Sequence, residues 1–315
     1  MCRIEKALDN LLIKTKSEIK SRVECVSFDV EIQDTKSRGY CYCLKREANG
    51  NLRLEDLIDY IDEKLVDYAI PKKEKEEALS HFQETGSTSK IIRLKKKAQQ
   101  LFTDLKKTGE GGEILLYILI EEFLKIPQLL SKMTLKTSPQ MHYHGADGIY
   151  VQYDKKSAHL HLYWGESKMY QDINAGISKC LDSIKDFLLD PMSASSVQER
   201  DIQLITSNIK DNVNHPELED MLVRYFDKDD DLSNKVVYKG ICFIGFDWDS
   251  YPTVEMEATI EDIKDKIIIE LEEWYSKVSK KIIARGNLAL KEMHIFLMPF
   301  SSVEKFREYY LKTIK

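Results

Sequence analysis

Strand-like and helix-like segments alternate along the C-terminal quarter of the chain, and this pattern limits the fold more than any other feature of the sequence. Apolar runs at Val236 to Phe246 and Met293 to Met298 predict strands. The helical spacing of apolar residues predicts helices at Ile260 to Ile283 and Val303 to Leu311. Strands that alternate with helices predict an α/β fold in which helices flank both faces of a mixed sheet.

A second alternating block lies upstream of this tail. Its expected elements are a buried helix at Ile114 to Leu124, a β-hairpin of Ala146 to Tyr153 and His159 to Trp164, and a helix from about Ile173 to Leu189. We therefore expect residues 109–315 to form one core. A polar, loosely helical stretch at about residues 190–234 is expected to be an insertion in this core.

Residues 1–108 are expected to form an N-terminal α+β region that faces a partner or DNA. The expected elements are strands at Val23 to Ile32 and Tyr40 to Arg46, followed by helices at Leu52 to Tyr68, Glu74 to Phe82 and Lys90 to Lys107. The last helix has a basic face that includes Lys95, Lys96 and Lys97. Such a face is most often solvated, and contact with phosphate groups is the alternative.

The charge balance excludes a generally basic nucleic-acid binder. The chain carries 47 Lys and Arg against 53 Asp and Glu, a formal net charge of −6. A binder with a local basic groove, or one that a partner loads onto its target, is still compatible with this balance. The sequence has no apolar run of membrane-spanning length and no secretory apolar core at Met1, so we expect a cytoplasmic protein without membrane contact.

Four charged residues occupy positions at which chemistry is expected. Glu113 begins the buried helix, and Asp147 begins the first hairpin strand. Glu166 and Lys168 end the second hairpin strand, where a period of two places both on the same face. The spacing between Asp147 and Glu166 suits two adjacent strands and a turn. The helix–strand–strand order therefore predicts a single site.

An all-oxygen donor set is the chemistry that these residues offer. Carboxylates on neighbouring strands, together with the Ser167 carbonyl, suit Mg²⁺ or Mn²⁺ rather than zinc. Such an ion polarises a phosphoryl oxygen and acidifies a bound water. Lys168 is expected to orient that water or to neutralise charge in the transition state. Glu113 is expected to add a third ligand, directly or through water.

Each residue also has a simpler interpretation when it is taken alone. Glu166 and Lys168 are compatible with an ordinary surface ion pair. Asp147 precedes a glycine, as turn residues often do, and Glu113 suits a helix N-terminus. Glu110 is an alternative to Glu113 as the helix acid, and the sequence does not decide between them. Only the combination of all three elements favours a catalytic site.

This combination resembles the PD-(D/E)XK nuclease superfamily, whose core has the order α-β-β-β-α-β. The segments GEILLY from Gly112, GADGI from Gly145 and GESKMY from Gly165 more closely resemble the HamA family of Hachiman anti-phage systems. The resemblance is strongest over residues 109–190. It departs from the superfamily pattern in that Ala146, rather than proline, precedes Asp147.

The resemblance implies a metal-dependent DNA nuclease that a superfamily-2 helicase partner, HamB, holds in check. It implies that Asp147 and Glu166 are metal ligands, Lys168 is the catalytic lysine and Glu113 is the helix acid. Delivery by a helicase would also explain how an acidic chain reaches DNA. The residues that we expect to contact DNA are Lys95, Lys96, Lys97, Lys132, Lys136 and His144.

Two other functions are compatible with the sequence. The chain is also compatible with a non-catalytic interaction subunit that retains a relict nuclease fold, which would bind no Mg²⁺ at Asp147 and Glu166. A metal phosphoesterase acting on RNA or nucleotides is the second alternative. Products formed from single-stranded DNA, duplex DNA and RNA would identify it.

Overall fold

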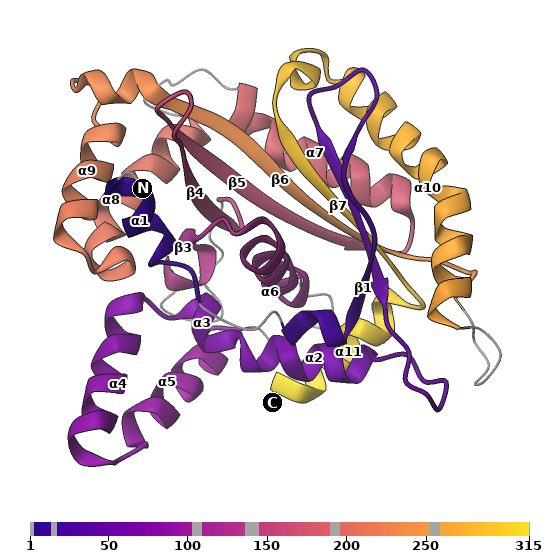
Figure 1. Ribbon diagram of the computed structural model, residues 1–315, viewed down its shortest axis with the longest axis horizontal. Helices are drawn as coiled ribbons and strands as arrows, with labels where there is room; N and C mark the ends of the chain where they lie inside the picture. The colour runs from indigo at the N-terminus through magenta and orange to yellow at the C-terminus, as the bar shows by residue number, and fades with distance from the viewer. Residues whose placement is uncertain are drawn as a thin grey trace.

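The computed structural model describes residues 3–13, 18–102, 109–135, 145–189, 196–251 and 259–314. A mixed sheet of seven strands crosses the molecule in the order β1-β2-β7-β6-β5-β4-β3 (Figure 1). The strands are β1 Val23–Glu31, β2 Arg38–Leu44, β3 Gln128–Ser131, β4 Gly148–Asp154, β5 His159–Tyr170, β6 Val236–Asp247 and β7 Met293–Phe300. The four central strands β2, β7, β6 and β5 are parallel, and the outer pairings are antiparallel.

Helices cover both faces of this sheet, as the alternating pattern predicts. The helices are α1 Arg3–Asp9, α2 Leu54–Glu63, α3 Leu65–Ala69, α4 Lys72–Thr85, α5 Ser89–Gln100, α6 Glu110–Leu119, α7 Ile173–Leu189, α8 Val197–Val213, α9 Pro216–Phe226, α10 Ile260–Ile283 and α11 Val303–Ile314. In β5, Trp164 stacks on Phe187 of α7, whereas Gly165 faces Leu116 of α6. Successive residues of β5 therefore face opposite helical layers. Helices lie on both sides of the sheet (Figure 1), and the predicted α/β class with a mixed sheet is confirmed.

The N-terminal strands belong to the same sheet as the rest of the chain. Strand β2 runs parallel to β7, with Tyr40 beside Phe296, and their rings stack 4.8 Å apart. The expected helix over residues 52–68 is two helices, because α2 ends at Glu63 and α3 begins at Leu65. The predicted helix at residues 90–107 corresponds to α5, which ends at Gln100. Residues 103–107 of the prediction lie outside the described chain.

The expected insertion contains two helices, α8 and α9, and the short helix η4 (Asp231–Lys235). Helix α8 packs against β3 and against α4, and α9 packs against α1. Apolar side chains are buried along these helices, including Ile202, Ile205 and Leu222. The insertion is therefore helical and packed against the body of the molecule.

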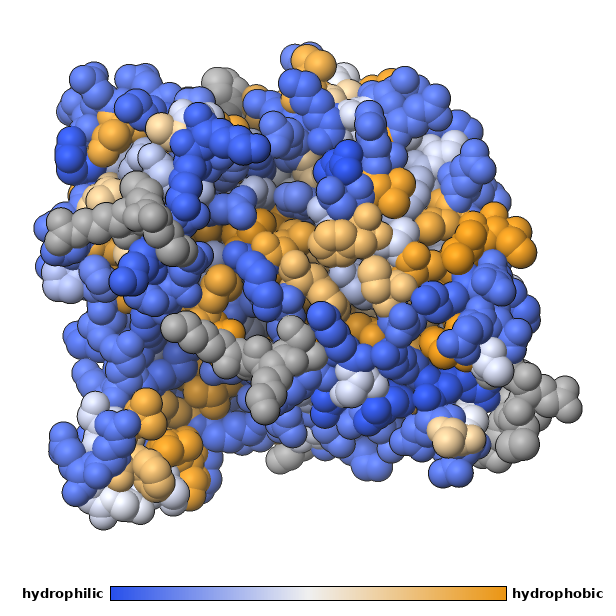
Figure 2. Space-filling view, in the orientation of Figure 1, coloured by the Kyte–Doolittle hydropathy of each residue, from blue (hydrophilic) through white to orange (hydrophobic). Residues whose placement is uncertain are grey.

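Helices α4 and α5 form a hairpin that projects from the lower left of Figure 1. Four of its large apolar side chains are exposed: Leu79, Phe82, Ile91 and Ile92. Apolar atoms gather on this projection in Figure 2. Across the described residues, no helix combines the length and apolar character required to cross a membrane.

Candidate active site

The candidate site lies where β4 begins and β5 continues past it. Gly148 is opposite Gly165, and β5 extends from there to Tyr170. Asp147 continues the hydrogen-bonding pattern just before β4. Its backbone N–H donates to the Gly165 carbonyl over 3.0 Å, and its carboxylate Oδ2 accepts the Ser167 N–H over 2.9 Å. The carboxylate of Asp147 is thereby fixed beside Glu166.

The backbone carbonyl of Asp147 connects the site to α3 and to the segment that follows β3. It accepts the hydroxyl of Tyr68 in α3 over 3.0 Å and the backbone N–H of Lys132 over 3.2 Å. Lys132 is the first residue of the short helix η3 (Lys132–Leu135), which directly follows β3. The segment that leaves β3 is thus attached to Asp147 through its main chain.

The ammonium group of Lys132 bridges two acids. Its Nζ lies 3.2 Å from Oδ1 of Asp147 and 3.3 Å from Oε1 of Glu113. Burial would lower the pKa of Lys132, but the neighbouring carboxylates of Asp147 and Glu113 raise it above its ordinary range. Lys132 is therefore a cation within the acidic cluster, although the sequence suggested only contact with DNA.

Glu113 reaches the cluster from the first turn of α6. Gly112 permits the close approach of this turn to β5, because a Cβ at Gly112 would lie 2.6 Å from Oγ of Ser167. Burial, followed by the charge of Asp147, raises the pKa of Glu113 to about 8. Glu110 is also buried, but Glu113 is the one of the two that lines the cleft described below. The geometry thus favours Glu113 as the helix acid.

Glu166 and Lys168 lie on the same face of β5 and contact each other through a hydrogen-bonded ion pair. Burial, followed by the charge of Asp147, raises the pKa of Glu166 to about 7. Burial opposes the charge of Lys168, but Glu166 and Asp147 raise its pKa above its ordinary value. The four predicted residues, with Lys132, therefore form one electrostatically connected group.

This group opens into a cleft of about 570 Å³. The cleft walls also contain Ser183 and Asp186 of α7, Arg200 of α8 and Arg307 of α11. Arg307 donates from Nη2 to the Met169 carbonyl, and its Nε is buried without a hydrogen-bond partner among the described atoms. Sequence patterns do not predict the roles of Tyr68, Arg200 and Arg307, because α3, α8 and α11 are distant in the chain from β4 and β5. Ser183 and Asp186 lie in α7, which directly follows β5, but no motif marks them.

The other residues expected to contact DNA do not line this cleft in the described part of the chain. Lys95 pairs with Asp62 over 2.7 Å, Lys97 pairs with Glu74 over 2.6 Å, and Lys96 is exposed. Lys136 and His144 lie outside the described residues. The basic face of α5 is therefore partly neutralised by acids of α2 and α4.

The donor chemistry fits a divalent ion at Asp147 and Glu166. Both carboxylates are buried, and their mutual repulsion contributes to the raised pKa of Glu166. Oxygen donors of this kind are preferred by Mg²⁺ and Mn²⁺. Among the described residues, no group of three His, Cys, Asp or Glu side chains is arranged to hold a metal ion as it stands. Lys132, rather than a third acid, lies against Asp147.

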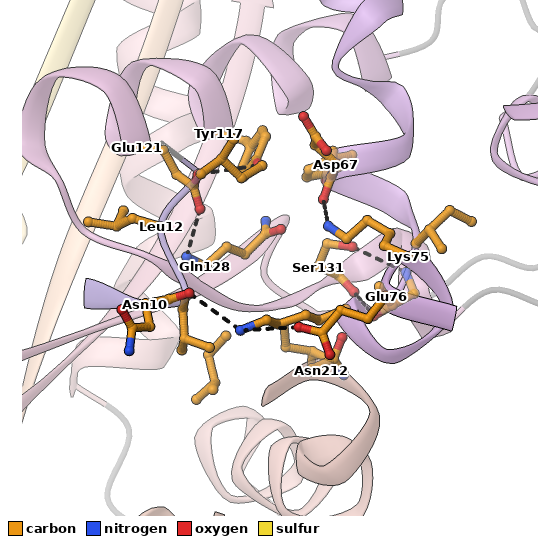
Figure 3. A pocket seen from close by; sticks show the side chains of 18 of the residues that line it. Asn10, Leu12, Asp67, Lys75, Glu76, Tyr117, Glu121, Gln128, Ser131 and Asn212 are labelled. Carbon is orange, nitrogen blue, oxygen red and sulfur yellow. Dashed lines mark hydrogen bonds and ion pairs between the residues drawn. The ribbon is translucent and has the colours of Figure 1, made fainter. Parts of the chain in front are cut away.

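Figure 3 shows a separate cavity, which has a volume of about 260 Å³. Tyr68, which bonds to Asp147 in the site, also lines this cavity. Glu121 points towards Gln128 and accepts its backbone N–H over 3.3 Å, while Lys75 donates to the Asp67 carbonyl over 3.0 Å. Burial raises the pKa of Glu121 to about 7, and burial lowers the pKa of Lys75. These buried charges make the cavity a polar one, separate from the acidic cluster.

Two comparisons with known proteins were informative in different ways. The comparison with curated proteins finds no match. The model of one protein family, described as HamA, matches residues 20–314, which is nearly the whole chain. The chain therefore belongs to the HamA family, whose members are components of the Hachiman anti-phage defence systems.

Proposed function

We propose that this chain is the metal-dependent DNA nuclease of its defence system and hydrolyses phosphodiesters under the control of a helicase partner. The observation that carries the proposal is the convergence of Glu113, Asp147, Glu166 and Lys168 on one cleft. These residues come from a helix and two adjacent strands, and three of them are buried acids. Two of these acids, Glu113 and Glu166, have raised pKa values, and buried acids with perturbed pKa values in a cleft are typical of functional sites.

The order of elements around the cleft supports a nuclease core of the PD-(D/E)XK type. From α6 the chain continues through β3, β4, β5, α7 and β6, which is the order α-β-β-β-α-β once the insertion of α8, α9 and η4 between α7 and β6 is set aside. The acids lie on the first helix of this series and where β4 begins beside β5. The likeness in order and site position supports the assignment of this fold type to residues 109–315.

The proposed reaction assigns a different task to each residue. A divalent ion held by Asp147 and Glu166 would acidify a bound water and polarise the scissile phosphate. Lys168, fixed beside Glu166, would stabilise the negative charge that develops on that phosphate. Arg307 and Arg200 line the same cleft and would bind the phosphate backbone on either side.

The helicase partner is proposed from the family and from the charge of the chain. At a net charge of −6, unaided binding to DNA is expected to be weak. We propose that the α4–α5 hairpin faces the partner, because it projects from the molecule and exposes Leu79, Phe82, Ile91 and Ile92 (Figure 2). This region belongs to the N-terminal residues expected to face a partner or DNA.

Cleavage of supercoiled plasmid with Mg²⁺ tests the proposal. Wild type is compared with Glu166→Gln and Lys168→Met, each with and without the helicase. Glu273→Gln, on an exposed side chain of α10, is the matched control. Wild type and the control are expected to nick or linearise the plasmid, and the two site variants are not. Cleavage that persists in both site variants would refute the assignment. No cleavage by an intact complex would favour a non-catalytic subunit.

A further inference from the structure

Lys132 is held in the acidic cluster by its main chain and by its side chain. Its backbone N–H donates to the Asp147 carbonyl, and its Nζ contacts Oδ1 of the same residue. The turn that carries it is fixed by Ser131, whose Oγ accepts the Thr134 N–H over 3.2 Å. Its side chain is only 21% exposed. Lys132 is therefore a fixed cation and not a mobile surface lysine.

Both oxygens of Glu113 already have donors. Oε1 lies 3.3 Å from Nζ of Lys132, and Oε2 lies 3.4 Å from the hydroxyl of Tyr68. The single hydroxyl proton of Tyr68 is shared with the Asp147 carbonyl, which is nearer at 3.0 Å. Glu113 thus holds Lys132 and Tyr68 against Asp147, and the ammonium group of Lys132 lies between the two acids.

The charges of the cluster lead to the same conclusion. When ionised, Glu113, Asp147 and Glu166 carry three negative charges, and Lys132 and Lys168 carry two positive ones. Removal of Lys132 would leave two buried acids, Glu113 and Asp147, without the cation that lies between them, which is costly unless another cation binds.

Building on the function proposed above, we infer that Lys132 is a built-in cation that occupies the space between Glu113 and Asp147. The site then takes one divalent ion, at Asp147 and Glu166, and Glu113 is a positioning residue rather than a metal ligand. The ammonium group stands where a second ion would otherwise bind two carboxylates. The resemblance implied no such role for Lys132 as a cation between Glu113 and Asp147.

The experiment counts Mn²⁺ ions bound to the full chain without nucleic acid, by titration calorimetry and electron paramagnetic resonance. Wild type and Glu113→Gln are each expected to bind one ion, and Asp147→Asn none. Lys132→Met is expected to bind two ions, because it frees the Glu113–Asp147 pair. The double variant Lys132→Met/Glu113→Gln is expected to return to one ion. Lys125→Met, on an exposed lysine, is the matched control.

The outcomes separate this inference from the proposed function. A single ion in Lys132→Met, or two ions in wild type, would overturn the role of Lys132 and leave the nuclease proposal standing. A wild-type chain that binds no ion would remove both. If Lys132→Met does not fold, the double variant and Lys132→Arg still test the inference. Both should bind one ion, and two ions in either would contradict it.

Discussion

The carboxylate of Asp147 accepts the backbone N–H of Ser167 over 2.9 Å, so that a side chain continues the hydrogen bonding between two strands just before β4 begins. The same residue donates its own N–H to Gly165. The position of this acid is thus set by the register of β4 against β5. A site built in this way is as rigid as the sheet that carries it.

Substitutions at Asp147 should separate this structural bond from the charge. Asp147→Asn keeps an acceptor for Ser167 and is expected to fold with near-normal stability but without divalent-ion binding. Asp147→Ala leaves the Ser167 N–H without a partner and is expected to cost about 1–3 kcal/mol of unfolding free energy. Urea unfolding of the two variants checks the difference. Equal destabilisation in both would show that charge, and not the hydrogen bond, fixes the strand end.

Gly112→Ala is expected to destabilise the protein even though alanine favours helices. The new Cβ would lie 2.6 Å from Oγ of Ser167 and 3.1 Å from Met169. Met169 is itself closely packed, because it lies against the backbone of Gly245 on the neighbouring strand, where a Cβ would be 3.1 Å from it. Overpacking of this kind costs about 1–3 kcal/mol, more than the ~1 kcal/mol that helix propensity returns.

Gly109→Ala is the control for this substitution. A Cβ at Gly109 meets only Oε1 of Glu113, at 4.0 Å, which is an ordinary contact. Denaturant unfolding should therefore show a loss of stability for Gly112→Ala and no comparable loss for Gly109→Ala. Similar effects at both positions would mean that the close approach of α6 to β5 is not what requires Gly112.

Glu121 should make the protein less stable as the pH rises. Burial raises its pKa to about 7 in the folded chain, above the ordinary value of 4.5. The contribution of Glu121 to the free energy of unfolding is fully present below pH ~4.5. It is lost as the pH rises through about 7, and the loss is at most ~3 kcal/mol. Glu121→Gln should therefore gain stability relative to wild type at pH 8 but not at pH 4.5. Thermal unfolding at several pH values measures this, and a pH-independent difference would contradict it.

The acidic part of the site can be predicted from the sequence because each of its residues is placed by a local pattern. The buried helix gives Glu113, and the spacing across a hairpin places Asp147 beside Glu166. A period of two then places Lys168 with Glu166. Each of these steps needs only a short stretch of chain, and the structure brings all four residues into one cleft.

The rest of the site depends on tertiary contacts that leave no local pattern. Lys132 is placed by β3, whose four residues are too few to show clear alternation. Tyr68 and Arg307 arrive from α3 and α11, which precede and follow the core helix and strands in the chain. The pairing of β2 with β7 is likewise long-range. Sequence periodicity identifies the elements but not the neighbours that each one acquires.

Arg307 is expected to contribute more to nucleic-acid binding in the cleft than to the stability of the fold. One nitrogen donates to Met169, and its Nε is buried without a partner in the described structure. Arg307→Lys keeps a charge but loses the planar fork, so it should weaken binding to a phosphate backbone by about tenfold. Lys305→Ala removes a charge from an exposed position of the same helix and is the control. Fluorescence anisotropy with short DNA and Ca²⁺, compared at two salt concentrations, measures the affinity. Unchanged affinity in Arg307→Lys would show that only the charge of Arg307 matters, whereas a loss larger than that of Lys305→Ala would assign Arg307 to the path of the substrate.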